Sequence, residues 1–412
     1  MAENPKILII GTADTKGDEL LYLKSRVEKA GGEGLVMDVG VLGDPPFTPD
    51  YTKHDVAEAA GTTNADIIAL GGEHKAMVSQ AKGASALTAK LHREGAIDAM
   101  LAIGGSMATD LALDVAAELP LGTPKIVIST IASSAMIPPE RLPADVLMLL
   151  WPGGLYGLNS VSRSVLSQGA GAVVGAVAGR DQSSDVRPLI GMTSLGSSTL
   201  KYMVHLKPEI EARGFELAVF HTTGLGGRAM ESLARKGAFA AVMDFSLVEV
   251  SDHLFESPIS AGADRLEGAG SAGVPQIVAP GGVTLVDLAT WKDVPEQFAD
   301  REFHIHNRFI ACAKFNVEER VAAAKVIAKK LMMAKGPTVF IMPLRGIDEW
   351  DKEDGPFHSE EGLAAFAATI RDSVKPPVTL IEIDAHINDK TFAETALAIL
   401  DGWIEDGTIP RS

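Results

Sequence analysis

The sequence contains few cysteines and few basic residues, and each shortage excludes a class of protein. Cys312 is the only cysteine among 412 residues, which excludes intrachain disulfides and cysteine-based metal clusters and favours a cytoplasmic location. Lys and Arg number 37 against 54 Asp and Glu, and the net charge is −17. Nucleic-acid-binding surfaces are usually basic, so we expect no nucleic-acid partner.

Long apolar runs and aromatic residues are also scarce. No segment approaches the ~20 consecutive apolar residues of a membrane helix, and the first residues, MAENPKILII, lack the basic start of a signal peptide. We therefore expect no membrane partner. Aromatic residues make up only 5% of the chain although 46% of it is hydrophobic, so the core must consist mainly of Ala, Val, Ile and Leu, as in the layers of α/β proteins.

The two halves of the chain begin with the same pattern. Residues 6–20 read KILIIGTADTKGDEL and residues 187–200 read RPLIGMTSLGSSTL; in both, an apolar run stops at a glycine, passes through small polar residues and continues as a helix. The chain also exceeds the roughly 250 to 300 residues at which a single core stops growing. The sequence therefore predicts two Rossmann-like α/β domains with mainly parallel sheets, residues 1–182 and 183–412, and a ligand cleft between them.

Further strand and helix segments alternate along both halves. In the first half, IDAMLAIGGS and PKIVIST read as strands, KAMVSQAKGASALTAKLHREG reads as a long helix, and ADIIALGG fits either a strand or a helix. In the second half, the segments that read as strands are FELAVFHTTG, FAAVMDF, VPQIVAPGG, PTVFIMPL and VTLIEIDAH. The polar segment DQSSDVRP, residues 181–188, separates the two series, and we expect the domain boundary there.

Three strand ends in the first domain carry residues suited to a nucleotide. Ligands of open α/β sheets bind at the carboxyl ends of the strands, where backbone amides and helix N-termini attract anions. The segments GTADTKGDEL, IGGSMATD and STIASSAM supply the candidate nucleotide-binding residues, which are Thr12, Asp14, Thr15, Lys16, Gly104, Gly105, Ser106, Ser129 and Ser133. GTADTKGDEL matches neither the dinucleotide fingerprint nor the P-loop, and helix caps or glycine turns explain the same residue types equally well.

The second domain has more ionisable groups at its strand ends. FHTTGLGGRAME, residues 220–231, places a histidine before a glycine-rich turn and an arginine after it, a combination suited to a carboxylate or phosphate. The candidate catalytic residues are His221, Arg228, Glu231 and His306. The candidate substrate-binding residues are Ser194, Ser197, Thr222, Gly226, Gly227 and His386.

Structural roles explain these residues as well. Arg228 and Glu231 are three residues apart, so a local ion pair on a helix is the simplest alternative. His304 and His306 share a face if the segment is extended and would suit a metal, but a third ligand is missing, and histidines with neither role are commoner. His386 lies in IDAHIND, whose residue types also suit a hydrogen-bonded turn.

A series of ordered segments resembles a known family. The segments are GTADTKGDEL, AKGASALTAKLHREG, AIGGS, GLNSVSRSVLSQGAGAVVGA, VFHTTGLGGRAMESL, SAGADRLEGAG, VPQIVAPGG and AHINDKTFA. Over essentially its full length the chain resembles the Tm-one-like ATP-binding proteins, which include the N-terminal inhibitory region of the tomato mosaic virus resistance protein. The resemblance implies a Rossmann-like nucleotide-binding domain, a second α/β domain, a homodimer or higher homo-oligomer, and binding of ATP with no established reaction.

Three segments differ from the family pattern, and one of them is WPGGLYGLN, which replaces an acidic and hydroxyl segment before Gly-Leu-Asn. Where the family has the phosphate loop GGSGGT, this chain has GGSMAT, with Met107 and Ala108 in place of two glycines; their side chains would crowd a phosphate against the backbone. Where the family has an arginine after HNP, this chain has Lys314, which lacks the bidentate fork. These differences predict weakened or lost nucleotide binding in this member.

Three functions from different classes are consistent with the sequence. The first is a nucleotide-binding enzyme that acts on a small acidic metabolite, with ATP and Mg²⁺ at the glycine loops. The second is a nucleotide-independent lyase or hydrolase of a small carboxylate or acyl substrate, in which His221 or His306 is the acid or base and Arg228 holds the carboxylate. The third is a non-catalytic binding or inhibitor protein. Turnover without nucleotide distinguishes the second from the first.

Overall fold

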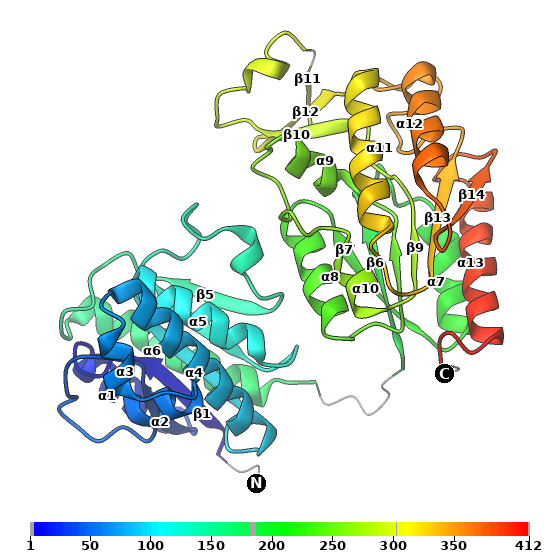
Figure 1. The fold of residues 1–412 in the computed structure, drawn as a ribbon. Coiled ribbons are helices and arrows are strands. Elements are labelled where there is room, and N and C mark those ends of the chain that lie inside the picture. Colours follow the sequence, from blue (N-terminus) through cyan, green and yellow to red (C-terminus); the bar gives the residue numbers. More distant parts are fainter. Residues whose placement is uncertain (1–3, 182–186, 302, 411–412) are drawn as a thin grey trace. The chain divides into compact units, whose positions relative to one another are not determined.

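The chain divides into two compact units, residues 1–183 and 184–412 (Figure 1). A computed structural model describes residues 4–181, 187–301 and 303–410. The predicted boundary between residues 182 and 183 lies outside the described residues. Each unit contains a parallel sheet with helices between its strands, which confirms the predicted two-domain α/β fold.

The first unit is built on a five-stranded sheet in the order β2-β1-β3-β4-β5, and every neighbouring pair is parallel. The strands are β1 (Lys6–Gly11), β2 (Glu33–Asp38), β3 (Ala99–Gly104), β4 (Lys125–Ser129) and β5 (Val146–Leu150). The helices are α1 (Gly17–Lys29), α2 (Lys53–Ala59), α3 (Asn64–Ala69), α4 (Glu73–Arg93), α5 (Ser106–Glu118), α6 (Ser160–Ala178) and the 3₁₀ turn η1 (Pro139–Arg141).

Helices cover both faces of this sheet. Apolar residues of α1 and α6 pack on one face, and those of α2, α4 and α5 pack on the other. The ambiguous segment ADIIALGG forms helix α3, because Thr63 and Asp66 close a capping box at its start. The chain passes from β1 to β2 on one side and then crosses to β3 on the other side of β1, so the loops after β1 and β3 separate there. Such a switch point leaves a crevice at the carboxyl ends of the strands.

The second unit is built on a six-stranded parallel sheet in the order β14-β13-β9-β8-β6-β7, which confirms the predicted second parallel sheet. Its strands are β6 (Leu189–Ser194), β7 (Glu216–His221), β8 (Ala241–Asp244), β9 (Gln276–Val278), β13 (Thr338–Pro343) and β14 (Thr379–Ile383). Its helices are α7 (Met203–Ala212), α8 (Leu225–Arg235), α9 (Val248–Leu254), α10 (Gly268–Ala272), α11 (Val317–Leu331), α12 (Glu360–Ser373), α13 (Lys390–Glu405) and the 3₁₀ turn η2 (Glu296–Phe298).

A separate antiparallel sheet was not expected from the sequence. It has the order β10-β12-β11, with β10 (Leu285–Ala289), β11 (Phe303–Ile305) and β12 (Ile310–Lys314). It lies beside α9 and α11 in Figure 1. Its inner face packs on apolar residues of the main body of the unit, including Val248, Phe357 and Trp350.

Helices of the second unit also cover both faces of the large sheet. Helices α7 and α13 pack on one face, and α9, α11 and α12 pack on the other. Within the described part of the chain, no helix combines the length and apolarity that a bilayer crossing requires.

Candidate functional site

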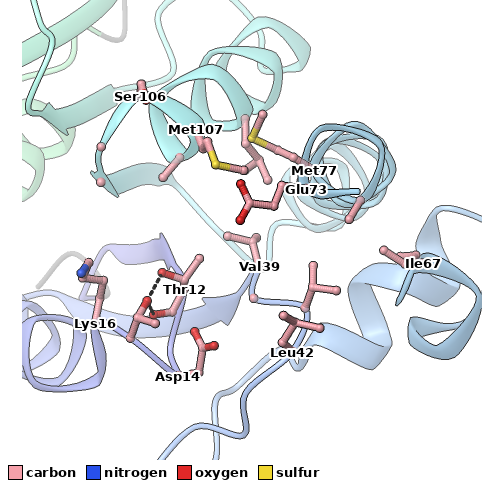
Figure 2. A pocket seen from close by; sticks show the side chains of 18 of the residues that line it. Thr12, Asp14, Lys16, Val39, Leu42, Ile67, Glu73, Met77, Ser106 and Met107 are labelled. Carbon is pink, nitrogen blue, oxygen red and sulfur yellow. Dashed lines mark hydrogen bonds between the residues drawn. The ribbon is translucent and has the colours of Figure 1, made fainter. Parts of the chain in front are cut away.

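A cavity of about 710 Å³ lies at the switch point of the first unit, beside the carboxyl ends of β1, β2 and β3 (Figure 2). This volume falls in the range of small-molecule sites. Seven of the nine predicted nucleotide-binding residues line the cavity, namely Thr12, Asp14, Thr15, Lys16, Gly104, Gly105 and Ser106. Most of the other lining residues are apolar, among them Val39, Leu42, Ile67, Met77 and Met107.

The N-termini of helices α4 and α5 lie at this cavity. Among the described residues, α1, α4 and α5 have no side-chain cap, whereas α2, α3 and α6 of the same unit each have a complete capping box. Gly72 and Gly105, the N-cap residues of α4 and α5, line the cavity. The first backbone amides of a helix lack intrahelical partners and carry partial positive charge, so both helix ends favour an anion there.

The glycine loop after β3 brings the backbone close to α5. A Cβ atom at Gly104 would lie 2.2 Å from the Cβ of Ala108, so only glycine fits at this position. Met107 follows on the first turn of α5; it is 44% exposed and its side chain lies along the cavity wall in Figure 2. Met107 and Ala108, which replace glycines of the family pattern, therefore both line the cavity, next to the glycine turn after β3.

The loop after β1 is held by internal contacts. Thr12 and Thr15 share a hydrogen bond between their hydroxyl groups at 2.8 Å. Lys16 Nζ donates to the carbonyl oxygen of Leu155 at 2.5 Å and lies 4.7 Å from the centroid of the Tyr156 ring. The ammonium group is therefore held by residues 155–156, at the side of the cavity.

Two acidic residues at this site were not recognised in the sequence. Glu73, the first residue of α4, lines the cavity together with Asp14. Asp38, at the end of β2, accepts hydrogen bonds from the amides of Ala13 (2.9 Å) and Gly40 (2.8 Å) and so fixes the two loops of the crevice. Burial raises the pKa of Asp38, against the lowering effect of these two amides. In the sequence, Asp38 could be recognised only as an acidic residue at the end of an apolar segment.

Two predicted nucleotide-binding residues lie elsewhere. Ser129 is fully buried, shares a hydrogen bond with Thr109 at 2.7 Å and accepts one from the amide of Ile131 at 3.0 Å. Ser133 lies in the turn that follows and has a φ of 62°. Neither residue is part of the cavity lining that the structure describes. The serine-rich segment after β4 therefore forms a turn of its own and does not contribute to the described cavity lining.

The predicted anion receptor around α8 is filled by the protein's own carboxylates. Glu249 Oε1 accepts hydrogen bonds from the amides of Gly224 (2.7 Å) and Gly227 (3.1 Å), the groups expected to hold a ligand. Arg228 Nη1 donates to both carboxylate oxygens of Asp264 at 2.8 Å. The alternative of a local Arg228–Glu231 pair is wrong, because each of these residues has a partner outside the helix.

The glycines of this segment allow close packing. A Cβ at Gly226 would lie 1.9 Å from the carbonyl oxygen of His221, and a Cβ at Gly227 would lie 1.6 Å from Glu249 Oε2. The first turn of α8 therefore packs directly on the end of β7. Steric fit explains both glycines without a substrate.

Glu231 belongs to a buried charge cluster around Arg265. Arg265 donates to Glu231 at 3.1 Å, to Glu249 at 2.8 Å and to Asp244 at 2.7 Å, and all four side chains are at most 2% exposed. Burial raises the pKa of Glu231 and raises that of Glu249 to about 7, although Arg265 opposes both shifts. Glu231 is therefore enclosed by this cluster and is not accessible to a ligand.

The remaining predicted residues either form hydrogen bonds that hold loops of the second unit or lie exposed at its surface. His386 uses both ring nitrogens, since Nδ1 accepts from the amide of Asn388 at 3.1 Å and Nε2 lies 2.9 Å from the carbonyl oxygen of Asp348. Thr222 is buried and donates to the carbonyl oxygen of Ser194 at 3.0 Å, whereas Ser197 is exposed. These contacts hold the loops at the carboxyl end of the large sheet.

His221 and His306 remain accessible. His221 is the last residue of β7 and is exposed, and its Nδ1 accepts a hydrogen bond from the amide of Gly196 at 3.2 Å. His304 and His306 both face the ring of Trp350, with centroid distances of 4.4 and 6.3 Å, as expected for alternate residues of an extended segment. The described residues contain no cluster of three or more His, Cys, Asp or Glu side chains that would hold a metal ion.

Comparison with known proteins identifies the family. Models of the uncharacterised protein family UPF0261 match residues 5–182 as its N-terminal domain and residues 187–404 as its C-terminal domain. The chain belongs to this family. A UPF0261 protein of Brucella melitensis is 52% identical over 99% of this chain and 98% of its own length.

The tomato relative and a solved structure are more distant. The ToMV resistance protein Tm-1 of Solanum lycopersicum is 28% identical over 98% of this chain and 56% of its own length, which confirms the predicted Tm-one-like relationship of this UPF0261 chain. The esterase domain of a Rhodothermus marinus protein aligns with 14% identity over 54% of this chain and 89% of that chain. Its TM-score of 0.31 is too low to support a functional comparison.

Proposed function

We propose that the N-terminal domain of this UPF0261 protein binds ATP as its magnesium complex. The observation that carries the proposal is that one cavity of about 710 Å³ gathers both predicted glycine and hydroxyl loops at the switch point of a parallel sheet. The resemblance to the Tm-one-like proteins supplies the identity of the nucleotide. Binding in an enzyme that acts on a small acidic metabolite remains our first functional hypothesis.

The phosphate end of the nucleotide fits the loop after β3. Gly105 and Ser106 lie at the uncapped N-terminus of α5, where free amides and the helix dipole favour negative charge. Gly104 permits the close approach of this loop to the helix. The base fits the apolar part of the cavity, whose wall contains Ile67 and Met77.

A magnesium ion fits the charges of the cavity. Among the described lining residues, Asp14 and Glu73 are acidic and Lys16 is basic. Free ATP would therefore be repelled by two carboxylates, whereas Mg²⁺ prefers carboxylate and phosphate oxygens and would lie between them. We expect affinity for ATP to require Mg²⁺, and the requirement to weaken when Asp14 is changed to Asn or Glu73 to Gln.

Isothermal titration calorimetry with ATP and Mg²⁺ tests the proposal. Leu42 lines the cavity and is 78% exposed, so Leu42→Asp adds a carboxylate to the site without disturbing a core. Leu121→Asp is the matched control, because Leu121 is 53% exposed in the same unit and is not among the lining residues. We expect Leu42→Asp to weaken binding at least about tenfold, the effect of about 1.4 kcal/mol of repulsion, and Leu121→Asp to leave it unchanged.

Two results would contradict the proposal. One is the absence of calorimetric binding by the unchanged protein with ATP and Mg²⁺ at millimolar concentration. The other is equal loss of affinity in Leu42→Asp and Leu121→Asp, which would place the nucleotide outside this cavity.

A further inference from the structure

The cavity of the first domain has a polar side and an apolar side. The loops after β1 and β3 form the polar side, with the side chains of Thr12, Lys16 and Ser106. Figure 2 shows Lys16 and Ile67 on opposite sides of the cavity. The side opposite Lys16, called the apolar end below, is formed by the loop after β2, by α3 and by the second turn of α4, with Val39, Val41, Leu42, Ile67, Ile68, Ala76 and Met77.

The order of the strands explains this division. Strand β1 lies between β2 and β3, so the loop after β1 separates the loop after β2 from the loop after β3. The loop after β3 runs directly into the uncapped helix α5. The helices that follow β2 begin differently, because Thr52 before α2 and Thr63 before α3 already accept hydrogen bonds from helix amides. An anion therefore finds free amides at α5, whereas the loop and helix that follow β2 offer apolar contact.

The apolar end has a buried base and an exposed rim. Ile67 and Ala76 belong to a small buried cluster, and Val41 packs against that cluster. At the rim, the side chains of Leu42 and Ile68 are 78% and 46% exposed. A flat ring that covered the rim would remove apolar surface from water, and its polar edge could still face the solvent.

The loop that carries Leu42 is fixed on both sides of this residue. The carbonyl oxygen of Gly40 accepts a hydrogen bond from Gln80 Nε2 at 2.6 Å. The amide of Gly43 donates to Asp14 Oδ2 at 3.2 Å. The side chain of Leu42 is therefore held at the rim without a ligand, and ordering it costs little when a ligand binds.

The side-chain amides behind the apolar end are used within the protein. Gln80 is fully buried and bonds the carbonyl of Gly40, and Asn64 Nδ2 donates to the carbonyl oxygen of Val41 at 3.1 Å. The amide oxygens of Gln80 and Asn64 are also buried. Neither amide reaches the cavity. The side chains of the apolar end itself contain no N–H or O–H donor and no oxygen acceptor.

These side chains can hold a base, but they cannot identify it. Adenine and guanine have similar flat faces and differ in the donors and acceptors along one edge. A site that forms hydrogen bonds to such an edge rejects the wrong ligand by about 10⁴-fold or more, whereas an apolar pocket discriminates far less. Contact with the faces of the ring favours both purines equally.

We propose that this cavity accepts nucleoside triphosphates as a class, with the base held by apolar contact and not selected by its edge. This inference rests on the proposed binding of the magnesium complex of ATP in the same cavity. The triphosphate and its metal ion supply the specific contacts, at the loops after β1 and β3. The apolar end adds affinity in proportion to the ring area that it covers.

Isothermal titration calorimetry with ATP, GTP and UTP, each with Mg²⁺, tests the inference. We expect the dissociation constants of ATP and GTP to agree within about tenfold, and UTP to bind more weakly because its smaller ring covers less apolar area. A preference for ATP over GTP greater than about tenfold would overturn the inference, because it requires a group that reads the base edge. UTP binding as tight as that of ATP would also overturn it, because the ring would then not rest on the apolar end.

A matched pair of variants tests where the base lies. Ile68 lines the cavity, and Leu70, the C-cap residue of the same helix α3, is 43% exposed but is not among the lining residues. We expect Ile68→Ala to weaken ATP and GTP by the same factor, about threefold or more, and Leu70→Ala to change neither. Both side chains are exposed, so the melting temperature of each variant should stay close to that of the unchanged protein. Loss of ATP affinity alone in Ile68→Ala, or equal losses in the two variants, would overturn the assignment.

The same titrations separate this inference from the proposed function. Binding of ATP with rejection of GTP would overturn the inference and leave the proposed function in place. Absence of ATP binding would overturn both. In Leu42→Asp, ATP and GTP should weaken together; GTP binding at unchanged affinity in that variant would show that GTP binds elsewhere and would overturn the inference.

Discussion

At the residue scale, Arg265 determines the charge state of the second domain's interior. One guanidinium serves three carboxyls, those of Glu231, Asp244 and Glu249, and none of the four side chains is more than 2% exposed. Removing one partner of a buried ion pair leaves an uncompensated charge, which costs about 3–5 kcal/mol. We expect Arg265→Leu to lower the free energy of unfolding in urea by at least that amount; an unchanged midpoint would show that the carboxyls are protonated without it.

The pH dependence of Glu249 gives a second expectation at this scale. Its folded pKa of about 7 lies above its ordinary value, so the folded protein binds more protons than the unfolded chain between about pH 4.5 and 7. The contribution of Glu249 to the free energy of unfolding is therefore fully present below pH 4.5 and falls as pH rises to 7, by up to about 3 kcal/mol. Urea denaturation at several pH values measures it.

Glu249→Gln removes this titration and is the reference for the measurement. The difference in free energy of unfolding between the unchanged protein and Glu249→Gln should fall as pH rises from 4.5 to 7. A difference that is constant over this range would show that Glu249 stays ionised throughout.

Residue types at strand ends were predictable from the sequence, but their partners were not. The loops containing Thr12, Lys16 and Gly105 were recognised because each follows an apolar strand, and all three line the cavity. The receptor at Arg228 was also recognised, but Glu249, which lies 22 residues after Gly227, occupies its amides. Spacing along the chain does not reveal a carboxylate that reaches the same amides from another helix.

At the element scale, the N-terminus of α5 links helix stability to ligand affinity. Met107 and Ala108 occupy its first turn, where the family pattern has glycines, and glycine costs a helix up to about 1 kcal/mol per residue. The side chains therefore favour the helix, while Met107 occupies part of the cavity wall.

Restoring the glycines tests this balance. We expect Met107→Gly with Ala108→Gly to tighten calorimetric binding of ATP with Mg²⁺ several-fold and to lower the thermal midpoint by a few degrees. Ala364→Gly, at an exposed position of α12 in the other domain, is the control that lowers helix stability without touching the cavity. Equal ATP affinity before and after the double change would show that these side chains do not crowd the phosphates.

Elements with a clear hydrophobic pattern could be predicted from the sequence. A sheet formed by strands that lie far apart in the chain could not. The parallel strands were recognised because each is an apolar run that ends in glycine or a polar residue, as β1 and β3 do. The antiparallel sheet was missed because β10 and β12 are separated by 20 residues and β11 is only three residues long. Asp287 and Cys312 become neighbours only through that pairing, so their contact could not be predicted from the sequence.

At the scale of the whole molecule, the two domains have separate interiors. Every buried apolar cluster that the structure describes lies within one unit, with none drawing residues from both. A unit with its own core is expected to fold by itself.

Calorimetric unfolding of the whole chain tests this independence. We expect residues 184–412, produced alone, to melt at the temperature of one transition of the whole chain. ATP with Mg²⁺ should raise only the other transition, because a ligand stabilises the domain that binds it. A single transition that ATP shifts as a whole would contradict independent folding.

The buried state of Cys312 has a practical consequence for measuring motion in this UPF0261 protein. The native thiol is 3% exposed and its pKa is raised, so it should react slowly with alkylating spin labels or fluorophores. A cysteine introduced at an exposed position of each domain then becomes the preferred attachment point, and the donor to Asp287 stays in place. Such a doubly labelled protein would report by dipolar spectroscopy how the interdomain distance changes when nucleotide is added.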